Sequence, residues 1–465
     1  MASRVGAKQS AKNDSRRSSR ADRYLVRRAE DEGMKFVFFR ASVMATLIVT
    51  CVPSDATADD WPHWRGVNRN SVVAESSGWD KGIWRLENSW DTNVGEGSSS
   101  PLVVAGRVYT MGWRSGRDHI GCLDVRTGKT LWSVSYECPR YGRVATGDQG
   151  LYSGPSSTPE FDTQTGFLYT LSTDGDLNCW DTRQRGRLIW SMNLYDKYNP
   201  PRRPRVGRSG LRDYGYSSSP LVFREWLVVE VGAGEGNLMA FDKRTGVRRW
   251  TSGSTSPAGH NGGPTPIIVE GLPCVAVHNH DGLLVVRMDK GHEGETVASY
   301  EWITSFANNI ASVTVYKNYV LLTSAYNQQR IAKFEITLRG ANKLWEQKHA
   351  SKVCSPVVHN GHIYWAWQQV ICLDFETGEL QWKGGRVSDA GSVVATKDER
   401  LVVWANRGDL MLVETASRSP KKYNELAAKK RMLGRSDAWP HIVLANNRLY
   451  CKDRMGSLRC LKIGD

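Results

Sequence analysis

The stretch ICLDFETGELQW, residues 371–382, is repeated several times along this chain of 465 residues. It returns as GCLDVRTGKTLW at 121–132, as MAFDKRTGVRRW at 239–250, and more loosely as NCWDTRQRGRLIW at 178–190. A motif that recurs at such intervals is typical of repeat proteins, in which each unit packs against its neighbours.

A larger unit surrounds each copy of the motif. It begins with a small residue and a proline, as at Ser99-Ser100-Pro101, and continues with an apolar strand, a glycine-containing turn and two further strands. Eight such units of about 40 to 60 residues predict an all-β fold, an eight-bladed β-propeller of four-stranded antiparallel blades. The aromatic residues expected on the fourth strands are Trp132, Trp190, Trp250, Trp302, Trp345, Trp382 and, less regularly, Tyr423.

The two ends of the repeat region complement each other. The last unit stops at residues 460–463 without a fourth strand, and a spare strand, Ser89-Trp90-Asp91-Thr92-Asn93-Val94, precedes the first unit. We expect this strand to complete the last blade and close the ring, which removes an unpaired sheet edge. Only residues 420–432 have a polar pattern typical of a helix.

The motif itself has a physical explanation as a turn followed by a docking residue. Asp374 can accept backbone N–H groups in the turn, and Gly378 can adopt a positive φ. Trp382 then packs against the neighbouring blade and buries ~150–250 Å². The motif is therefore expected to build shape, and the blade-docking residues are Asp124, Gly128, Trp132, Trp190, Asp242, Gly246, Trp250, Trp345, Asp374, Gly378 and Trp382.

The first 58 residues differ from the rest in composition. Residues 1–33 are polar and basic, which predicts a disordered segment or a start upstream of the true one. Residues 34–58 run from Met34-Lys35 through an apolar stretch to Ala56-Thr57-Ala58, a pattern typical of a cleaved signal peptide. We therefore expect a periplasmic or secreted propeller over residues 59–465, touching a membrane only peripherally or through an uncleaved signal segment.

Charge and cysteine content narrow the function classes. The net charge of +14 is spread over the whole chain, which does not indicate a nucleic-acid partner. Four cysteines, at 122, 179, 372 and 460, occupy one position of the motif in different units, too far apart to bridge each other. We expect them to be small buried hydrophobic residues, and the pairing of the other cysteines stays open.

The candidate site lies in the loops that join a fourth strand to the next first strand. These loops share one face of a propeller, opposite the motif turns, and two of them, 133–156 and 191–217, are long and rich in Tyr and Arg. We expect them to bind a small polar or anionic ligand, or a protein partner, at the mouth of the central channel. The candidate residues are Tyr141, Tyr152, Arg208, Arg212, Asp213, Tyr214, Tyr216, His260, Asn261, Asn308, Asn309, Asp437, Trp439 and His441.

Other chemistry finds less support. Any one of these polar residues can instead satisfy loop backbone. His278 and His280 lie two residues apart, but Asp281-Gly282 marks a hairpin turn and no third metal ligand is evident. The glycine-rich segment 232–236 joins two strands and opens no helix, so it does not predict a nucleotide site. We therefore predict no catalytic residue and no metal site.

With Asp374, Thr377, Gly378 and Trp382, the motif resembles the PQQ-like repeat, and the resemblance covers about residues 61–465. Two groups share this repeat: quinoprotein dehydrogenases, which bind PQQ and calcium, and BamB proteins, non-catalytic propellers that scaffold outer-membrane protein assembly. The start DWPHWRG, residues 60–66, looks like exported PQQ-like propellers of uncharacterised function.

Departures from both groups shape the expectation. The chain lacks the adjacent cysteines of quinoprotein alcohol dehydrogenases, and Thr50 does not fit the lipoprotein signal of BamB proteins. The resemblance implies a monomeric, non-enzymatic, BamB-like binding or scaffold propeller without a cofactor. The alternatives are a PQQ- and calcium-dependent alcohol or sugar dehydrogenase and a carbohydrate-binding propeller.

Overall fold

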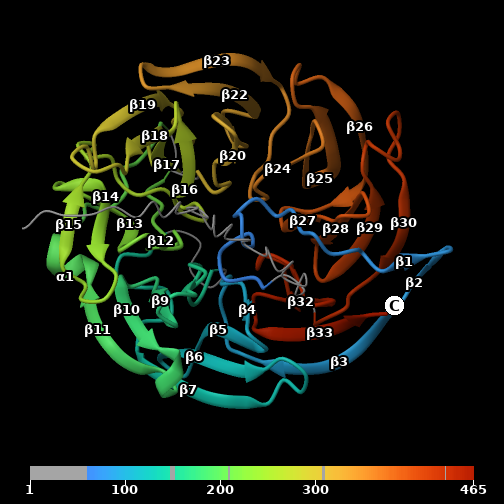
Figure 1. The fold of residues 1–465 in the computed structure, drawn as a ribbon, viewed down its shortest axis with the longest axis horizontal. Helices are drawn as coiled ribbons and strands as arrows, with labels where there is room; N and C mark the ends of the chain where they lie inside the picture. The colour runs from blue at the N-terminus through green and yellow to red at the C-terminus, as the bar shows by residue number, and fades with distance from the viewer. Residues whose placement is uncertain (1–59, 147–151, 208–209, 306–308, 435, 465) are drawn as a thin grey trace, which may run out of the picture. The chain divides into compact units, whose positions relative to one another are not determined.

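Eight antiparallel sheets surround a common centre in the computed structural model, which describes residues 60–146, 152–207, 210–305, 309–434 and 436–464 (Figure 1). All lie in the compact unit Ser54–Asp465. Blades 1 to 4 comprise β4 (Leu102–Val104), β5 (Arg107–Arg114), β6 (Arg117–Asp124) and β7 (Thr130–Glu137); β8 (Glu160–Asp162), β9 (Phe167–Leu171), β10 (Asp176–Asp181) and β11 (Arg187–Asn193); β12 (Leu221–Phe223), β13 (Trp226–Ala233), β14 (Gly236–Asp242) and β15 (Arg248–Thr251); and β16 (Thr265–Val269), β17 (Leu272–His278), β18 (Gly282–Arg287) and β19 (Thr296–Glu301).

Blades 5 to 8 follow the same order from the centre outward, which confirms the predicted eight-bladed propeller. They comprise β20 (Thr314–Tyr316), β21 (Tyr319–Ser324), β22 (Arg330–Thr337) and β23 (Gly340–Gln347); β24 (Val357–His359), β25 (His362–Asp374) and β26 (Leu380–Val387); β27 (Gly391–Ala395), β28 (Arg400–Ala405), β29 (Asp409–Glu414) and β30 (Glu425–Lys429); and β31 (Val443–Ala445), β32 (Arg448–Lys452), β33 (Ser457–Ile463) and β3 (Leu86–Asn93). Outside the blades lie β1 (Trp79–Asp80), β2 (Ile83–Trp84), the helix α1 (Leu194–Tyr198) and a 3₁₀ turn at Thr182–Gln184.

Blade 6 contains one unusually long strand. The first residues of β25 pair with β24, and its last residues pair with β26, so β25 serves as both the second and the third strand. Gln368, between the two parts, has a φ of 60°.

The ring closes through the N-terminal strand, as predicted. β3 pairs antiparallel with β33, and Trp90 lies opposite Cys460. The helix expected over 420–432 is wrong: residues 425–429 form β30, in which Ala427 lies opposite Leu412 of β29. Pairing with a buried strand overrides the local helical preference of this alanine-rich stretch.

The register explains why the motif combines a small residue with a tryptophan. Next to the same bulge in successive blades, Trp132 lies opposite Cys122, Trp190 opposite Cys179 and Trp382 opposite Cys372. A small side chain opposite the ring lets the indole lie over the strand and reach the next blade. Trp90, Trp250 and Trp345 occupy the same position in blades 8, 3 and 5.

Two of the expected fourth-strand aromatics are misplaced. The register puts Ala298 of blade 4 and Ala427 of blade 7 at the tryptophan position. Trp302 follows the end of β19 and is fully buried there, with its indole N–H donating to Ser324 Oγ. Tyr423 precedes β30 and packs on Trp382 of the preceding blade with ring centroids 5.9 Å apart.

Each docking tryptophan meets the glycine turn of the next blade. A Cβ added at Gly128 would lie 2.6 Å from the Trp90 ring, at Gly246 2.9 Å from Trp190, and at Gly378 2.8 Å from Trp345. The indole N–H of Trp90, Trp190 and Trp345 also donates to a backbone carbonyl of that turn. The expected inter-blade contact is thus a ring lying flat on a glycine.

The aspartate of the motif holds the turn as expected. Asp374 Oδ1 accepts the backbone N–H of Glu376 at 2.9 Å, the N–H of Thr377 at 2.7 Å and the Thr377 hydroxyl at 3.1 Å. Asp124 and Asp242 repeat these bonds with Thr127 and Thr245. Burial alone would raise the pKa of Asp374, but these donors hold it below its usual value.

The cysteines behave as small hydrophobic residues. All eight described cysteines, from Cys122 to Cys460, are free and buried. Burial raises the pKa of the Cys122 and Cys354 thiols to about 11, which suppresses the reactive thiolate.

The segment between residue 60 and β1 crosses the centre of the ring (Figure 1). Trp61 forms a bridge with Val103 of blade 1, and Val72 forms one with Ala395 of blade 7. Glu160 at the start of β8 receives His63 Nδ1 at 3.0 Å and also pairs with Arg69. We call residues 60–77 the plug, because they touch the innermost strands of blades on opposite sides of the channel.

Arg65 is the buried centre of the plug. Its guanidinium donates to Ser71 Oγ at 3.0 Å, to Thr314 Oγ1 at 3.3 Å and to the Pro356 carbonyl at 2.5 Å. Burial lowers its pKa to about 10, and none of the described carboxylates forms an ion pair with it. Neutral oxygens from blades 5 and 6 therefore solvate this cation and tie the plug to the ring.

The docking contact predicts a difference between two glycine substitutions. Gly361 and Gly378 have φ values of 76° and 73°, but only Gly378 faces a ring, since nothing lies within 4 Å of a Cβ at Gly361. Gly361→Ala should cost about 1 kcal/mol from backbone strain alone. Gly378→Ala should cost roughly 3 kcal/mol, because Trp345 must also move. Urea unfolding midpoints measure both, and equal losses would contradict ring-on-glycine docking.

Candidate functional site

A cavity of about 290 Å³ lies where the loops between blades converge. Its walls come from the segments that lead into β4, β8, β12, β16, β20, β24 and β31, together with Trp64 of the plug. The predicted convergence of these loops on one face is therefore confirmed. The lining residues are Trp64, Ser98, Tyr152, Ser156, Arg212, Tyr214, Ser217, His260, Asn261, Gly262, Ile310, Tyr326, Lys352, Val353 and Trp439.

Six of the candidate residues line this cavity: Tyr152, Arg212, Tyr214, His260, Asn261 and Trp439. Sequence reasoning missed Trp64, Tyr326 and Lys352. Trp64 belongs to the DWPHWRG stretch, whose aromatic density was a usable signal. Tyr326 and Lys352 come from short connections in which no residue type stood out.

The other described candidates lie outside the lining. Tyr141 packs on Arg140, and Asp437 lies 3.8 Å from Arg407. Four more are buried and hold the surroundings of the cavity: Asp213, Tyr216, Asn309 and His441. Arg208 and Asn308 fall outside the described residues, as does the signal segment 34–58.

Aromatic rings form a continuous wall of the cavity. Tyr152 lies edge-on to both Trp439 and Tyr214, with centroids 6.0 and 5.4 Å apart. Tyr214 continues to His260 at 4.9 Å, and its backbone N–H donates to His260 Nε2 at 3.2 Å. Such edge-to-face pairs contribute about 0.5–1.5 kcal/mol each, so the rings hold one another in place.

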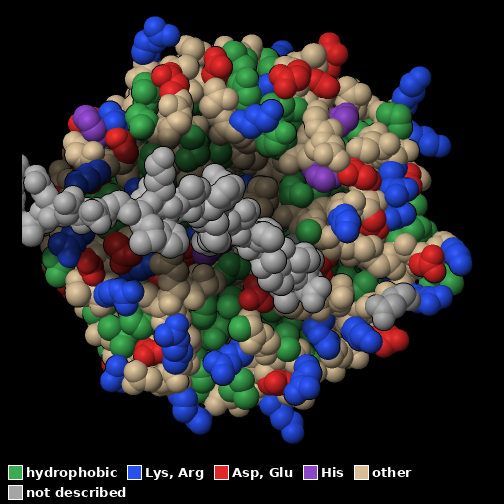
Figure 2. Space-filling model, viewed as in Figure 1, with side chains coloured by type: hydrophobic (Ala, Val, Ile, Leu, Met, Phe, Trp, Pro, Cys, Tyr) green, Lys and Arg blue, Asp and Glu red, His purple; other side chains and the backbone are tan. Residues whose placement is uncertain are grey.

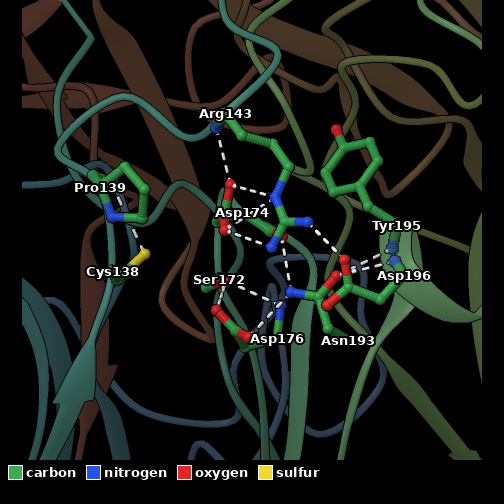
Figure 3. A network of polar contacts seen from close by, with 9 residues as sticks. All are labelled: Cys138, Pro139, Arg143, Ser172, Asp174, Asp176, Asn193, Tyr195 and Asp196. Carbon is green, nitrogen blue, oxygen red and sulfur yellow. Dashed lines mark hydrogen bonds and ion pairs between the residues drawn. The ribbon is translucent and has the colours of Figure 1, made fainter.

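The first long loop is anchored by Arg143 (Figure 3). Its backbone N–H and Nε donate to Asp174 Oδ1 at 2.6 and 3.1 Å, and Nη1 pairs with Asp196 of α1. The Asp174 hydrogen bonds raise the pKa of Arg143. Asn193 Oδ1 caps α1 by accepting the Tyr195 N–H, and its amide binds the Asp174 carbonyl at 3.0 Å. The loop that carries Tyr152 is thus tied to blade 2.

A buried ion pair anchors the second long loop. Arg203 Nη1 lies 2.6 Å from Asp213 Oδ1, and both side chains are almost fully buried. Arg203 also donates to the carbonyls of Ala258 and Gly259, at 2.6 and 3.1 Å. Burial alone would raise the pKa of Asp213, but the charge of Arg203 holds it down. The loop of Arg212 and Tyr214 is therefore fixed against the loop of His260.

Glu230 orients the polar side of the cavity. This fully buried carboxylate accepts the Gly259 N–H at 2.8 Å and the Asn261 amide at 3.1 Å, and it binds the Ser218 hydroxyl. Burial raises its pKa. Trp64 packs so closely on Gly262 that a Cβ there would lie 2.4 Å from the indole nitrogen. Asn261 and Gly262 thus sit on a rigid support.

The charges around the cavity are positive. Arg212 and Lys352 are its cations, and the described lining residues include no carboxylate. The wider surface is mixed: on the face in Figure 2, Lys and Arg side chains are spread around the circumference among Asp and Glu. The positive character is therefore local to the cavity, and no basic stripe of the kind that binds nucleic acid covers this face.

The His278–His280 pair does not form a metal centre. His278 is fully buried with Nδ1 3.2 Å from the Ala311 carbonyl, and burial lowers its pKa to about 4. His280 Nδ1 lies 2.7 Å from Asp281. Across the described ranges no group of three or more His, Cys, Asp or Glu residues is placed to hold a metal ion. Over the same residues, no helix is long and apolar enough to span a membrane.

The chain is similar to two kinds of curated and solved proteins. It is 29% identical over 177 residues to the dehydrogenase subunit of the quinone alcohol dehydrogenase of Gluconobacter oxydans, and 28% identical over 207 residues to that of Komagataeibacter europaeus. These matches cover 36% and 42% of this chain but only 21% and 25% of those subunits. The chain thus spans about a quarter of the length of the curated relatives it matches.

The structural likeness concerns the fold alone. BamB from Moraxella catarrhalis matches with a TM-score of 0.55 and 14% identity over 81% of this chain and 100% of that one. The quinohemoprotein alcohol dehydrogenase of Comamonas testosteroni matches with a TM-score of 0.57 and 13% identity over 87% of this chain and 80% of that one.

The family profile decides between these likenesses at the level of the repeat. The PQQ-repeat family described as outer membrane protein assembly factor BamB matches residues 116–384, more than half of the chain. These residues include three full copies of the Asp-Thr-Gly-Trp motif and the blades that carry both long loops. The protein therefore belongs to the PQQ-repeat, BamB-type family of β-propellers.

Proposed function

We propose that this propeller is an exported, non-catalytic binding protein that holds its ligand in the cavity between the loops. One observation carries the proposal: the cavity is lined by rings and cations whose supporting loops are each fixed by buried polar contacts. Such preorganisation lowers the entropy lost on binding. A cavity of about 290 Å³ is also near the lower end of the range for small-ligand sites.

The lining chemistry defines the ligand. Tyr152, Tyr214 and Trp439 offer apolar faces, while Arg212 and Lys352 offer positive charge. Serine hydroxyls and Asn261 add hydrogen-bonding groups. A ligand with a flat or apolar ring face and an anionic group meets all of these features.

Export rests on the sequence of residues 34–58. The buried cysteines are compatible with it, because thiols whose pKa burial raises resist oxidation and exchange.

A PQQ- and calcium-dependent dehydrogenase is the alternative activity, and the cavity does not fit it. Calcium takes six to eight oxygen ligands and favours carboxylates. The described lining has none, and the nearest buried carboxylates are engaged: Asp213 by Arg203, and Glu230 by Ser218, Gly259 and Asn261. No catalytic step through this cofactor follows from these residues.

Scaffolding of a partner protein is a second candidate, favoured by the outer rim. Apolar side chains stay more than a third exposed on or beside the outermost strands of several blades: Leu131, Leu188, Val247, Leu344 and Leu380. These strands are also sheet edges, where another chain can pair. Capture of a protein from an envelope fraction that depends on Leu344 and Leu380 would support this role.

Cavity substitutions should abolish ligand binding. Tyr214→Ala and Arg212→Ala should each weaken binding by about ten-fold or more, because each removes a contact made in a largely enclosed site. The measurement is a glycan array and a thermal-shift screen of aromatic and sugar acids, followed by calorimetry. Arg126→Ala, an exposed arginine in a motif turn, is the matched control and should bind normally. Equal binding by all three variants would remove the cavity as the site.

Cofactor loading should fail. Purified protein mixed with PQQ and calcium chloride should take up no stoichiometric PQQ and should show no alcohol- or sugar-dependent dye reduction, because the cavity lacks carboxylate ligands. Absorbance after gel filtration and a dye assay measure the two. Stoichiometric uptake with turnover would overturn the non-catalytic proposal.

A further inference from the structure

A second cavity of about 460 Å³ lies beside the first, between blades 5 and 6. Tyr326 and Lys352 line both cavities, so the two adjoin at these side chains. Buried Ala325, Ala350 and Ile371 belong to its lining. Its remaining residues are Gln329, Lys348, His349, Trp367, Gln368, Gln369 and Lys383.

The second cavity is strongly basic. Lys348, Lys352 and Lys383 line it, and no carboxylate is among the lining residues. Lys352 pairs with Asp389, which also accepts the Trp367 indole N–H at 3.1 Å. Across the described residues, neither Lys348 nor Lys383 has a carboxylate within ion-pair distance. Burial lowers the pKa of His349, and the charge of Lys383 lowers it further.

Neutral groups in this cavity are suited to hydroxyls and ring faces. Three glutamine amides, Gln329, Gln368 and Gln369, can each donate and accept hydrogen bonds. Trp367 and Tyr326 are half-buried and present aromatic faces. Amides that pair with hydroxyls, and rings that pack on the apolar faces of sugars, are a combination that recognises carbohydrate.

The backbone around the cavity is held in an uncommon conformation. Tyr326, Gln329 and Gln368 have φ values of 60°, 46° and 60°, in the left-handed region that non-glycine residues seldom adopt. Each costs about 1 kcal/mol or more, and such strain often accompanies binding sites. Gln328 helps to hold the first of these turns, donating to the Ile303 carbonyl at 2.5 Å.

We propose that the two cavities form one elongated site for an acidic oligosaccharide. One sugar-acid residue occupies the aromatic cavity, with its anionic group toward Arg212 and Lys352. The chain then passes Tyr326 and runs between blades 5 and 6, where Lys348 and Lys383 meet further anionic groups. This inference rests on the proposed function, because it takes the central cavity as the first part of the site.

The observations favour a sugar chain over an acidic peptide. A peptide of acidic residues would use the lysines but would leave the glutamine amides and the aromatic faces without matched partners. An oligosaccharide presents hydroxyls, apolar ring faces and carboxylates at every residue, so it uses all three features.

The test measures affinity against chain length. Calorimetry of the full protein with oligogalacturonates of one to six residues should show affinity rising with length, and added salt should weaken the longer oligomers most. Lys348→Gln and Lys383→Gln should each weaken hexamer binding by about three- to five-fold and leave monomer binding unchanged. Lys421→Gln, an exposed lysine in the motif turn of blade 7, is the matched control and should bind as the unmodified protein does.

Each outcome has a distinct meaning. If the monomer binds and the hexamer binds no tighter, or if the lysine variants bind the hexamer normally, the second cavity is not part of the site and the central-cavity proposal stands. Equal binding of neutral xylo-oligosaccharides overturns the acidic assignment, and equal binding of a hexaglutamate peptide overturns the sugar assignment. If sugar acids do not bind and other ligands still depend on Arg212, this inference alone fails. If no ligand depends on Arg212 or Tyr214, both proposals fail.

Discussion

The contact of an indole ring with the glycine turn of the next blade is the interaction on which the ring depends. The ring lies flat because the opposing residue is a glycine, and it reaches across because the residue opposite it in its own blade is often as small as a cysteine or alanine. The same glycine has a positive φ that the turn requires. One position thus serves both local backbone geometry and packing between blades, which leaves little freedom for substitution.

The plug and the cavity follow from this ring. Eight blades enclose an axial space that innermost strands alone do not fill, and the N-terminal segment enters it with Arg65 solvated by neutral oxygens. Above it, Trp64 contributes to the cavity that the inter-blade loops surround. The buried Arg203–Asp213 pair then fixes a loop that would otherwise lose conformational freedom on binding.

Much of the fold could be predicted because its rules are local and repeated. The turn of Asp374 and Gly378, the alternation that buries Trp382, and the closing strand around Trp90 all follow from short patterns. The errors have a common cause. Trp302 was assigned by spacing alone, although a longer turn shifts the register of blade 4, and residues 425–429 form a strand because β29 pairs with them.

The amino-acid sequence by itself determined the architecture and the face of the propeller on which to search, because strand order decides which loops share a face. Only the tertiary structure decided which loop residues line the cavity. Tyr214 and Tyr216 are alike in sequence, yet Tyr214 lines the cavity and Tyr216 is buried with its hydroxyl on the Val231 carbonyl. Their roles differ because contacts between blades, distant in the chain, set the direction of each side chain. The basic cavity beside Lys383 likewise exists only where blades 5 and 6 meet.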